Sequence, residues 1–284
     1  MLCKKKFTLP YVTIKKGVRS SRIKKILYIT LALALLSSTS PFSIADSIKD
    51  PVIQIVTEHL PPYQIVAEDK SISGFAVDII EEIMARSHFT YSLKSYPWAR
   101  AYKLAQRKPN HCIFSVARLP SREKLFKWVG PISKVNNTVV WALKDKNIKV
   151  NSLEDVKKYT LAVNRNDIGH TGLMELGFEE DKHLYVLNNT ESLINLLITR
   201  PEIDLIVADD TTINYRAQLV GANINKLQRV FKIDALPLNF FFACSPQTDD
   251  TTITHLADKL ESIYLDNTYE TIWNKWKFKL MPTK

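Results

Sequence analysis

Hydrophobic residues along the chain recur at two spacings, one typical of β-strands and one typical of amphipathic helices. Short apolar runs rich in β-branched residues, such as 52–57, predict buried strands. Between 75 and 87 the apolar positions fall on one helical face, with Glu81 and Glu82 opposite. The first third predicts alternating elements in the order strand 52–57, helix 75–87, strand 89–96, helix 98–107 and strand 111–117. This βαβαβ order predicts a parallel sheet covered by helices.

A second α/β unit follows Pro131, and a shorter segment closes the chain. The second unit predicts strands at 137–144, 160–164, 184–188 and 204–209, with helices at 153–159, 171–176 and 191–199. The last segment predicts a strand at 238–245 and helices at 251–265 and 269–278. We therefore expect an α/β fold of two lobes, in which residues 46–136 and 237–284 form lobe 1 and residues 137–236 form lobe 2. The chain would cross twice between the lobes, which allows hinged closure over a cleft.

The first 45 residues have the composition of a signal peptide. Nine Lys and Arg residues and no acidic residue precede Ala45, and an apolar run at 26–36 follows these cations. The run is short for a transmembrane helix and leads into Ser43-Ile44-Ala45, whose small residues suit a signal peptidase. We predict that residues 1–45 are removed on export to the periplasm. An uncleaved N-terminal anchor is the alternative.

The charge balance changes once this segment is set aside. The whole chain has 39 Lys and Arg against 29 Asp and Glu, a formal net charge of +10. Without residues 1–45 these counts become 30 and 29. The positive excess that would indicate a nucleic-acid partner therefore lies in the predicted signal peptide. We expect no nucleic-acid partner.

Two cysteines, Cys112 and Cys244, remain after the predicted signal peptide, and both lie in apolar runs. An oxidising compartment permits a disulfide between them, and a pair of buried free thiols is the alternative.

Motifs typical of enzymes are absent from the sequence. With seven glycines the chain contains neither G-x-G-x-x-G nor a Walker loop, which argues against a nucleotide phosphate site. The six histidines show no zinc-binding spacing, and there is no G-x-S-x-G nucleophile elbow. We expect no metal, no cofactor and no catalytic activity.

Charged residues lie instead at the ends of predicted strands, where open α/β sheets place their ligands. Arg118 and Arg122 follow strand 111–117, and a guanidinium offers two parallel donors that match a carboxylate. Solvated turn arginines are the alternative. Asp209 ends strand 204–209 and could face an ammonium group across the cleft. Since neighbouring strand residues point to opposite sides, only one of Asp209 and Asp210 should reach the ligand, and we favour Asp209. The alternative role is that of a helix N-cap, which suits Asp210 better.

Aromatic residues and one loop complete the candidate site. Tyr63 and Trp98 could form walls around the apolar part of a ligand, with core packing as the alternative. Arg100 lies two residues beyond Trp98, and Glu58 ends the first strand. The loop at 164–170 joins a strand to a helix whose first amides could receive an anion, with an ordinary surface loop as the alternative.

The segments GFAVDIIEEI, SREKLFKWVGPI, NSLEDVKKYTLAVNRNDIG, EIDLIVADD and TYETIWNKWKF occur in an order that resembles a known family. They are similar to the bacterial extracellular solute-binding proteins, family 3, of the polar amino acid uptake type, over 52–278. The resemblance implies a type II periplasmic binding fold with the ligand in the interlobe cleft. It also implies that Arg122 binds the ligand carboxylate and that Asp209 binds its amino group.

The same resemblance matches Tyr63 and Trp98 to the aromatics that enclose the ligand, and the loop from Asn164 to Gly169 to its second-lobe contacts. The sequence departs from the family pattern beside the ligand, where the usual threonine and glycine are replaced by Ala117 and Ser115. In the second-lobe loop, small residues are replaced by the longer polar ones at 165–167. The resemblance therefore implies the fold and a small amino-acid-like ligand, but not which one.

We expect a monomeric periplasmic protein that closes over this ligand and delivers it to an inner-membrane ABC permease. One alternative is an enzyme on the same scaffold, such as a dehydratase of a small cyclic acid with Glu58 as general acid. Another is a receptor that reports the ligand to a membrane partner.

Overall fold

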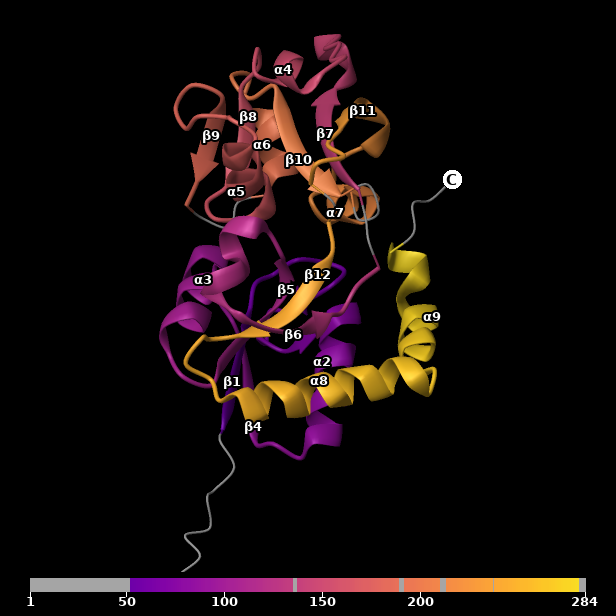
Figure 1. Ribbon diagram of the computed structural model, residues 1–284. Helices are drawn as coiled ribbons and strands as arrows, with labels where there is room; N and C mark the ends of the chain where they lie inside the picture. The colour runs from indigo at the N-terminus through magenta and orange to yellow at the C-terminus, as the bar shows by residue number, and fades with distance from the viewer. Residues whose placement is uncertain (1–51, 135–136, 189–191, 210–212, 237, 281–284) are drawn as a thin grey trace, which may run out of the picture. The chain divides into compact units, whose positions relative to one another are not determined.

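The structure of the chain is a computed structural model that describes residues 52–134, 137–188, 192–209, 213–236 and 238–280 (Figure 1). The predicted signal peptide at 1–45 and the predicted N-cap Asp210 lie outside these residues. The described part has the predicted α/β character, with two five-stranded sheets and helices packed against them.

The first sheet has the strand order β4-β1-β5-β12-β6. Its strands are β1 (Ile53–Thr57), β4 (Tyr91–Ser95), β5 (His111–Ala117), β6 (Lys127–Pro131) and β12 (Phe240–Cys244). β1 pairs in parallel with β4 and β5, which confirms the predicted βαβαβ unit. β12 enters between β5 and β6 and runs antiparallel to both, so the end of the chain completes the first sheet.

Helices cover the two faces of the first sheet. They are α2 (Phe75–Ser87), α3 (Trp98–Arg107), α8 (Asp250–Leu265) and α9 (Thr268–Leu280). Alternate residues of a strand point to opposite faces. Accordingly Ile53 and Ile55 pack in the cluster with α2, α8 and α9, whereas Val56 packs in the cluster with α3. No described helix has both the length and the apolar character needed to cross a membrane.

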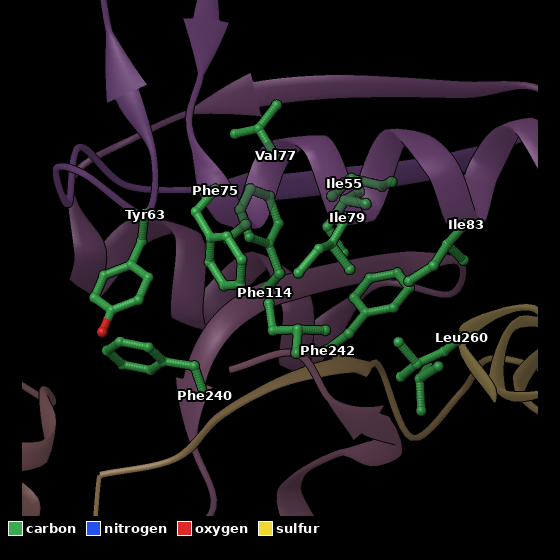
Figure 2. Close-up of a cluster of buried hydrophobic side chains, with 14 of the residues drawn as sticks. Ile55, Tyr63, Phe75, Val77, Ile79, Ile83, Phe114, Phe240, Phe242 and Leu260 are labelled. Carbon is green, nitrogen blue, oxygen red and sulfur yellow. The ribbon is translucent and has the colours of Figure 1, made fainter. Parts of the chain in front are cut away.

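A large apolar cluster fixes the first sheet against α2 and α8 (Figure 2). Phe75 and Ile79 of α2 face Phe114 of β5 and Phe242 of β12, and all four side chains are fully buried. Burial of each such side chain contributes about 1.5–3 kcal/mol to the free energy of unfolding. The cluster therefore holds β5 and β12 against α2 and α8.

The second sheet has the strand order β11-β7-β10-β8-β9. Its strands are β7 (Thr138–Leu143), β8 (Leu161–Asn164), β9 (Leu184–Leu187), β10 (Leu205–Asp209) and β11 (Leu227–Lys232), and its helices are α4 (Leu153–Val156), α5 (Ile168–Glu175), α6 (Leu193–Thr199) and α7 (Ile213–Leu219). The lobe boundaries at 136 and 237 stay a prediction, because both residues lie outside the described ranges.

Several short elements were not predicted from the sequence. They are the small sheet of β2 (Ile65–Val66) with β3 (Ile72–Ser73), the strands β6 and β11, and the 3-10 turns η1 (Pro120–Leu125), η2 (Lys144–Lys146) and η3 (Ile224–Lys226). The helix expected after Asp210 is present as α7.

A disulfide joins Cys112 to Cys244, which resolves the alternative of two free thiols. The two cysteines lie opposite each other on the neighbouring strands β5 and β12, although 132 positions separate them in sequence. The bond ties the returning strand to the first part of lobe 1.

Candidate functional site

Two adjoining cavities lie where the strands of the two sheets end. The smaller, here called the small chamber, has a volume of about 80 Å³, and the larger, the large chamber, about 330 Å³. Both chambers are lined by residues from both predicted lobes. The residues common to the two chambers are Glu58, Leu60, Trp98, Asn164, Leu193, Val207, Ala208 and Arg216.

Most of the predicted ligand-binding residues line the small chamber. These are Glu58, Trp98, Ala117, Arg122, Asn164, Gly169 and Asp209. The fold therefore brings together residues that are far apart in the sequence. That they bind a ligand stays a prediction.

The other three predicted residues lie outside both chambers. Tyr63 is buried, and its ring packs edge-on against Phe240 at a centroid distance of 4.8 Å. Arg100 is exposed, and its guanidinium lies 4.5 Å from the centroid of the Tyr96 ring. Arg118 forms an ion pair with Glu123 at 2.5 Å. Core packing and surface pairing account for these three side chains in the present structure.

Arg122 lies on η1 just after β5 and is only 1% exposed. Its Nη1 donates to the Ala117 carbonyl at 3.1 Å. Its Nη2 crosses to the second lobe and donates to the carbonyls of Asn166 and Asp167, both at 2.9 Å, and to Thr171 Oγ1 at 3.1 Å. This arginine therefore links the two lobes directly.

The charge of Arg122 is not neutralised by a nearby acid. Among the described residues no carboxylate lies within 4.0 Å of its guanidinium, and its buried Nε has no hydrogen-bond partner. Burial lowers the pKa of Arg122, with Tyr102, Asp167 and Glu175 opposing that shift from longer range. A buried cation without a partner anion is costly, so this site favours the entry of an anionic group.

Three further polar atoms of the small chamber are buried without a partner in the described part of the chain. They are Trp98 Nε1, Asn164 Oδ1 and Thr138 Oγ1. Buried polar atoms are normally hydrogen-bonded, and each exception calls for an explanation such as a missing ligand or water. Together with Arg122 Nε, these residues of the chamber wall carry two N–H donors, one amide oxygen and one hydroxyl that have no partner in the described part of the chain.

Glu58 directly follows β1 and lines both chambers. Burial raises the pKa of its carboxyl to about 8, nearby Asp167 raises it further, and Arg216 opposes this shift. Glu58 therefore carries its proton at neutral pH.

Asp167 begins α5 and uses its side chain to cap that helix. Its carboxylate accepts from the His170 amide at 2.7 Å and from the Asn164 amide at 3.3 Å. Burial raises the pKa of Asp167, whereas these hydrogen bonds lower it. The His170 backbone amide at the start of α5 is therefore bonded within the protein and is not free to receive an anion.

Asp209 ends β10 and is buried in the wall of the small chamber. Its Oδ2 lies 3.8 Å from Nη2 of Arg216, a residue of α7. Arg216 also donates from Nε to the Pro61 carbonyl of lobe 1 at 3.3 Å. Sequence reasoning missed Arg216, and the one available signal was a cation in the segment that follows the strand end.

Ser115, which the family resemblance places beside the ligand, lines the small chamber. It has a φ of 58°, and the pairing of β5 with β12 skips it, from Val116 opposite Phe241 to Phe114 opposite Phe242. An extra residue of this kind forms a β-bulge, which turns the following side chains to the other face. Accordingly Phe114 packs with α2 and Val116 packs with α3.

Comparison with known proteins agrees with the geometry of the fold. Residues 52–279 match the model of the bacterial extracellular solute-binding proteins, family 3. No curated protein sequence matches the chain.

Solved structures with the same fold share few identical residues with the chain. A histidine kinase sensor domain with similarity to periplasmic binding proteins has 18% identity and a TM-score of 0.70, with 82% of this chain and 99% of that chain covered. An ABC uptake transporter substrate-binding protein from Streptococcus pneumoniae, with bound histidine, has 17% identity, a TM-score of 0.69 and coverage of 82% and 95%. The ancestral amino acid-binding protein AncCDT-1, a precursor of cyclohexadienyl dehydratase, has 17% identity, a TM-score of 0.62 and coverage of 79% and 94%. The chain therefore belongs to the bacterial extracellular solute-binding proteins, family 3, and has their two-lobed type II periplasmic binding fold.

Proposed function

We propose that the protein binds a small amino-acid-like solute through its carboxylate, between the two lobes. The observation that carries this proposal is the buried guanidinium of Arg122, which has no carboxylate partner among the described residues and whose Nε is unpaired. A ligand carboxylate would neutralise this charge and accept hydrogen bonds from Arg122 Nε and Trp98 Nε1. Asp209, across the same chamber, is the proposed partner of the ligand ammonium group.

Closure of the lobes completes this site. Arg122 extends from lobe 1 to carbonyl oxygens of the loop at 166–167 in lobe 2, so these contacts exist only when the lobes are together. A ligand that contacts both lobes binds the closed arrangement better than the open one, and this differential affinity shifts the equilibrium toward closure.

Export and transport follow from the same proposal. The family consists of extracellular proteins, and residues 1–45 have the composition of a signal peptide, which supports a periplasmic location. One structural neighbour is the substrate-binding protein of an ABC uptake transporter, which supports delivery to an inner-membrane ABC permease. Ligand uptake by cells with and without this gene tests the transport step.

Calorimetric titration of the purified protein with amino acids and small carboxylates tests the binding step. We expect Arg122→Lys to weaken the binding of a carboxylate ligand at least about tenfold, because a lysine ammonium cannot keep the bonds to Ala117, Asn166 and Asp167 and also replace the Nε donor. Arg118→Lys is the matched control, since Arg118 lies four positions earlier and pairs with Glu123 at the surface. Unchanged affinity in a folded Arg122→Lys variant would contradict the proposal.

The protonated carboxyl of Glu58 favours a second candidate function, a dehydratase of a small cyclic acid. A neutral carboxylic acid at a cavity wall can act as a general acid. Glu58 would give its proton to a leaving hydroxyl group, which departs as water as its C–O bond breaks. The electrons for the new double bond would come from a neighbouring C–H bond, whose proton passes to Asp167.

Turnover separates the two candidate functions. If the protein only binds, a cyclic hydroxy acid that stabilises it is recovered unchanged. If the protein is a dehydratase, product forms and Glu58→Gln stops its formation.

A further inference from the structure

The large chamber is not explained by the binding of a carboxylate in the small chamber. Its volume of about 330 Å³ is roughly twice that of an engineered cavity of about 150 Å³ that holds benzene. Its walls outside the shared residues are mostly apolar and come from several segments of the chain. They include Pro97, Ala99, Leu187, Ile194, Leu219 and Val220.

The charged residues of the large chamber disfavour a cationic occupant. Among the described residues that line it, Glu58 is the one acid, and burial keeps its carboxyl protonated at neutral pH. Two guanidinium groups, those of Arg165 and Arg216, line the same space. Burial and Arg216 lower the pKa of His59, so that imidazole is neutral as well.

The acid that pairs with Arg165 is already engaged within the protein. Arg165 contacts Glu180 through two hydrogen bonds of 3.2 Å and donates to Asn188 Oδ1 at 2.5 Å. Glu180 also contacts His170 Nε2 at 2.9 Å. A cationic ligand group in the large chamber would therefore lose its hydration without gaining a described carboxylate partner.

We propose that the large chamber receives an uncharged, apolar group about as large as an aromatic ring, so that the ligand is an aromatic or large aliphatic amino acid rather than a basic one. This proposal rests on the proposed function, because it places the ligand carboxylate beside Arg122. The ligand side chain then extends past Trp98 and Leu193, which line both chambers.

A matched set of amino acids tests this proposal by calorimetric titration of the purified protein. Phenylalanine, leucine, arginine, lysine and alanine share one head group and differ in the side chain. We expect phenylalanine or leucine to bind at least tenfold tighter than arginine and lysine, and also tighter than alanine. Arginine or lysine binding as tightly as phenylalanine and leucine would overturn the proposal.

The same titrations separate failure of this proposal from failure of the proposed function. One outcome is that Arg122→Lys weakens the binding of every amino acid that binds, while arginine and lysine bind best. That outcome supports the carboxylate site at Arg122 and contradicts the proposal that the large chamber receives an apolar group. If no member of the set binds, or if Arg122→Lys has no effect, the proposed function itself fails.

Two variants probe the large chamber directly. Leu219 lines it and is 52% exposed, so Leu219→Asp adds a carboxylate at a position that tolerates one. In this variant we expect the ratio of the affinity for phenylalanine to the affinity for arginine to fall at least threefold. Ile198→Asp is the control, because Ile198 is 46% exposed and lies outside both chambers.

Filling the large chamber gives an independent result. Ala99 lines that chamber alone, so Ala99→Trp reduces its volume without reaching the small chamber. We expect at least tenfold weaker phenylalanine binding and alanine binding within about threefold of the wild type. Equal losses for both amino acids, or no loss for phenylalanine, would count against the proposal.

Discussion

We infer that the charge of Glu58 depends on whether the lobes are together. Burial raises its pKa to about 8 in the present structure, Asp167 of lobe 2 raises it further and Arg216 of lobe 2 opposes the shift. In separated lobes the carboxyl would be hydrated and would titrate near its ordinary pKa of 4.5. Closure of the lobes at a pH between 4.5 and 8 would therefore take up a proton.

We predict that ligand affinity depends on pH because of this proton. The raised pKa stabilises the closed form fully below pH 4.5, and that stabilisation is lost as the pH rises to 8. Affinity should fall by up to about tenfold per pH unit within this window and level off above it. Titrations between pH 6 and 9 in buffers of different ionisation enthalpy measure both the affinity and the proton uptake.

Glu58→Gln provides the control, since glutamine is neutral at every pH in this range. Its affinity should vary much less with pH than that of the wild type. A wild-type profile as flat as that of the variant would show that Glu58 does not titrate with closure.

Sequence reasoning identified residue types and strand ends better than side-chain partners. Arg118 and Arg122 follow the same strand, yet Arg122 enters the small chamber and Arg118 pairs at the surface with Glu123. Tyr63 was expected beside the ligand, but Phe240, from the returning strand, packs against its ring. These outcomes depend on residues distant in sequence, which a local pattern does not reveal.

At the scale of secondary-structure elements, long periodic segments were predicted well and edge strands were not. The bounds of α2 and α3 agree with the prediction, because apolar residues recur through each helix at regular spacing. β6 contains Gly130 and Pro131, and β11 contains Arg229 and Lys232, and both strands lie at sheet edges. Edge strands tolerate glycine, proline and charge, so they lack a clear hydrophobic pattern.

The start of α2 depends on Gly74. This residue has a φ of 140°, and a Cβ added to it would lie 2.3 Å from the backbone oxygen of Tyr63. Because backbone atoms cannot move aside cheaply, we predict that Gly74→Ala lowers the free energy of unfolding by about 3 kcal/mol or more. Chemical denaturation of the purified variants measures this loss.

Gly221→Ala separates steric contact from backbone conformation. Gly221 has a φ of 66°, but a Cβ there would meet nothing within 4 Å. Gly221→Ala should lower the free energy of unfolding by about 1–2 kcal/mol, which is the cost of a left-handed conformation alone. Equal losses in the two variants would contradict the steric explanation.

At the scale of the whole molecule, hydrogen bonds from Arg122 and Arg216 join the two lobes. The alternation of two α/β units predicted two lobes and a cleft, and family membership confirms that architecture. The closed contact between Arg122 and the loop at 166–167 was not predictable, because its acceptors are backbone carbonyls that carry no sequence signature.

Thr171 allows this contact to be weakened without altering either chamber. Its Oγ1 accepts from Arg122 Nη2 at 3.1 Å, and the residue lines neither cavity. A hydrogen bond to a charged group is typically worth about 1.5–3 kcal/mol. We predict a smaller loss for Thr171→Val, about 3–10-fold in ligand affinity, because Arg122 Nη2 keeps its two carbonyl acceptors, Asn166 and Asp167. Small-angle X-ray scattering without ligand should show a larger open fraction.

Thr199→Val is the matched control, because Thr199 Oγ1 donates to the Asn195 carbonyl of its own helix and lines neither chamber. Its affinity and scattering should equal those of the wild type. If Thr171→Val behaves in the same way, the Arg122 contact does not govern closure.

The position of β12 also sets when the first sheet can be completed. The strands of the second sheet all lie between 138 and 232, so that sheet does not need β12, at 240–244, for its assembly. Until β12 has joined, β5 has an unpaired edge, and such an edge can pair with other chains. The first sheet therefore stays open to wrong pairing until almost the whole chain is available to fold.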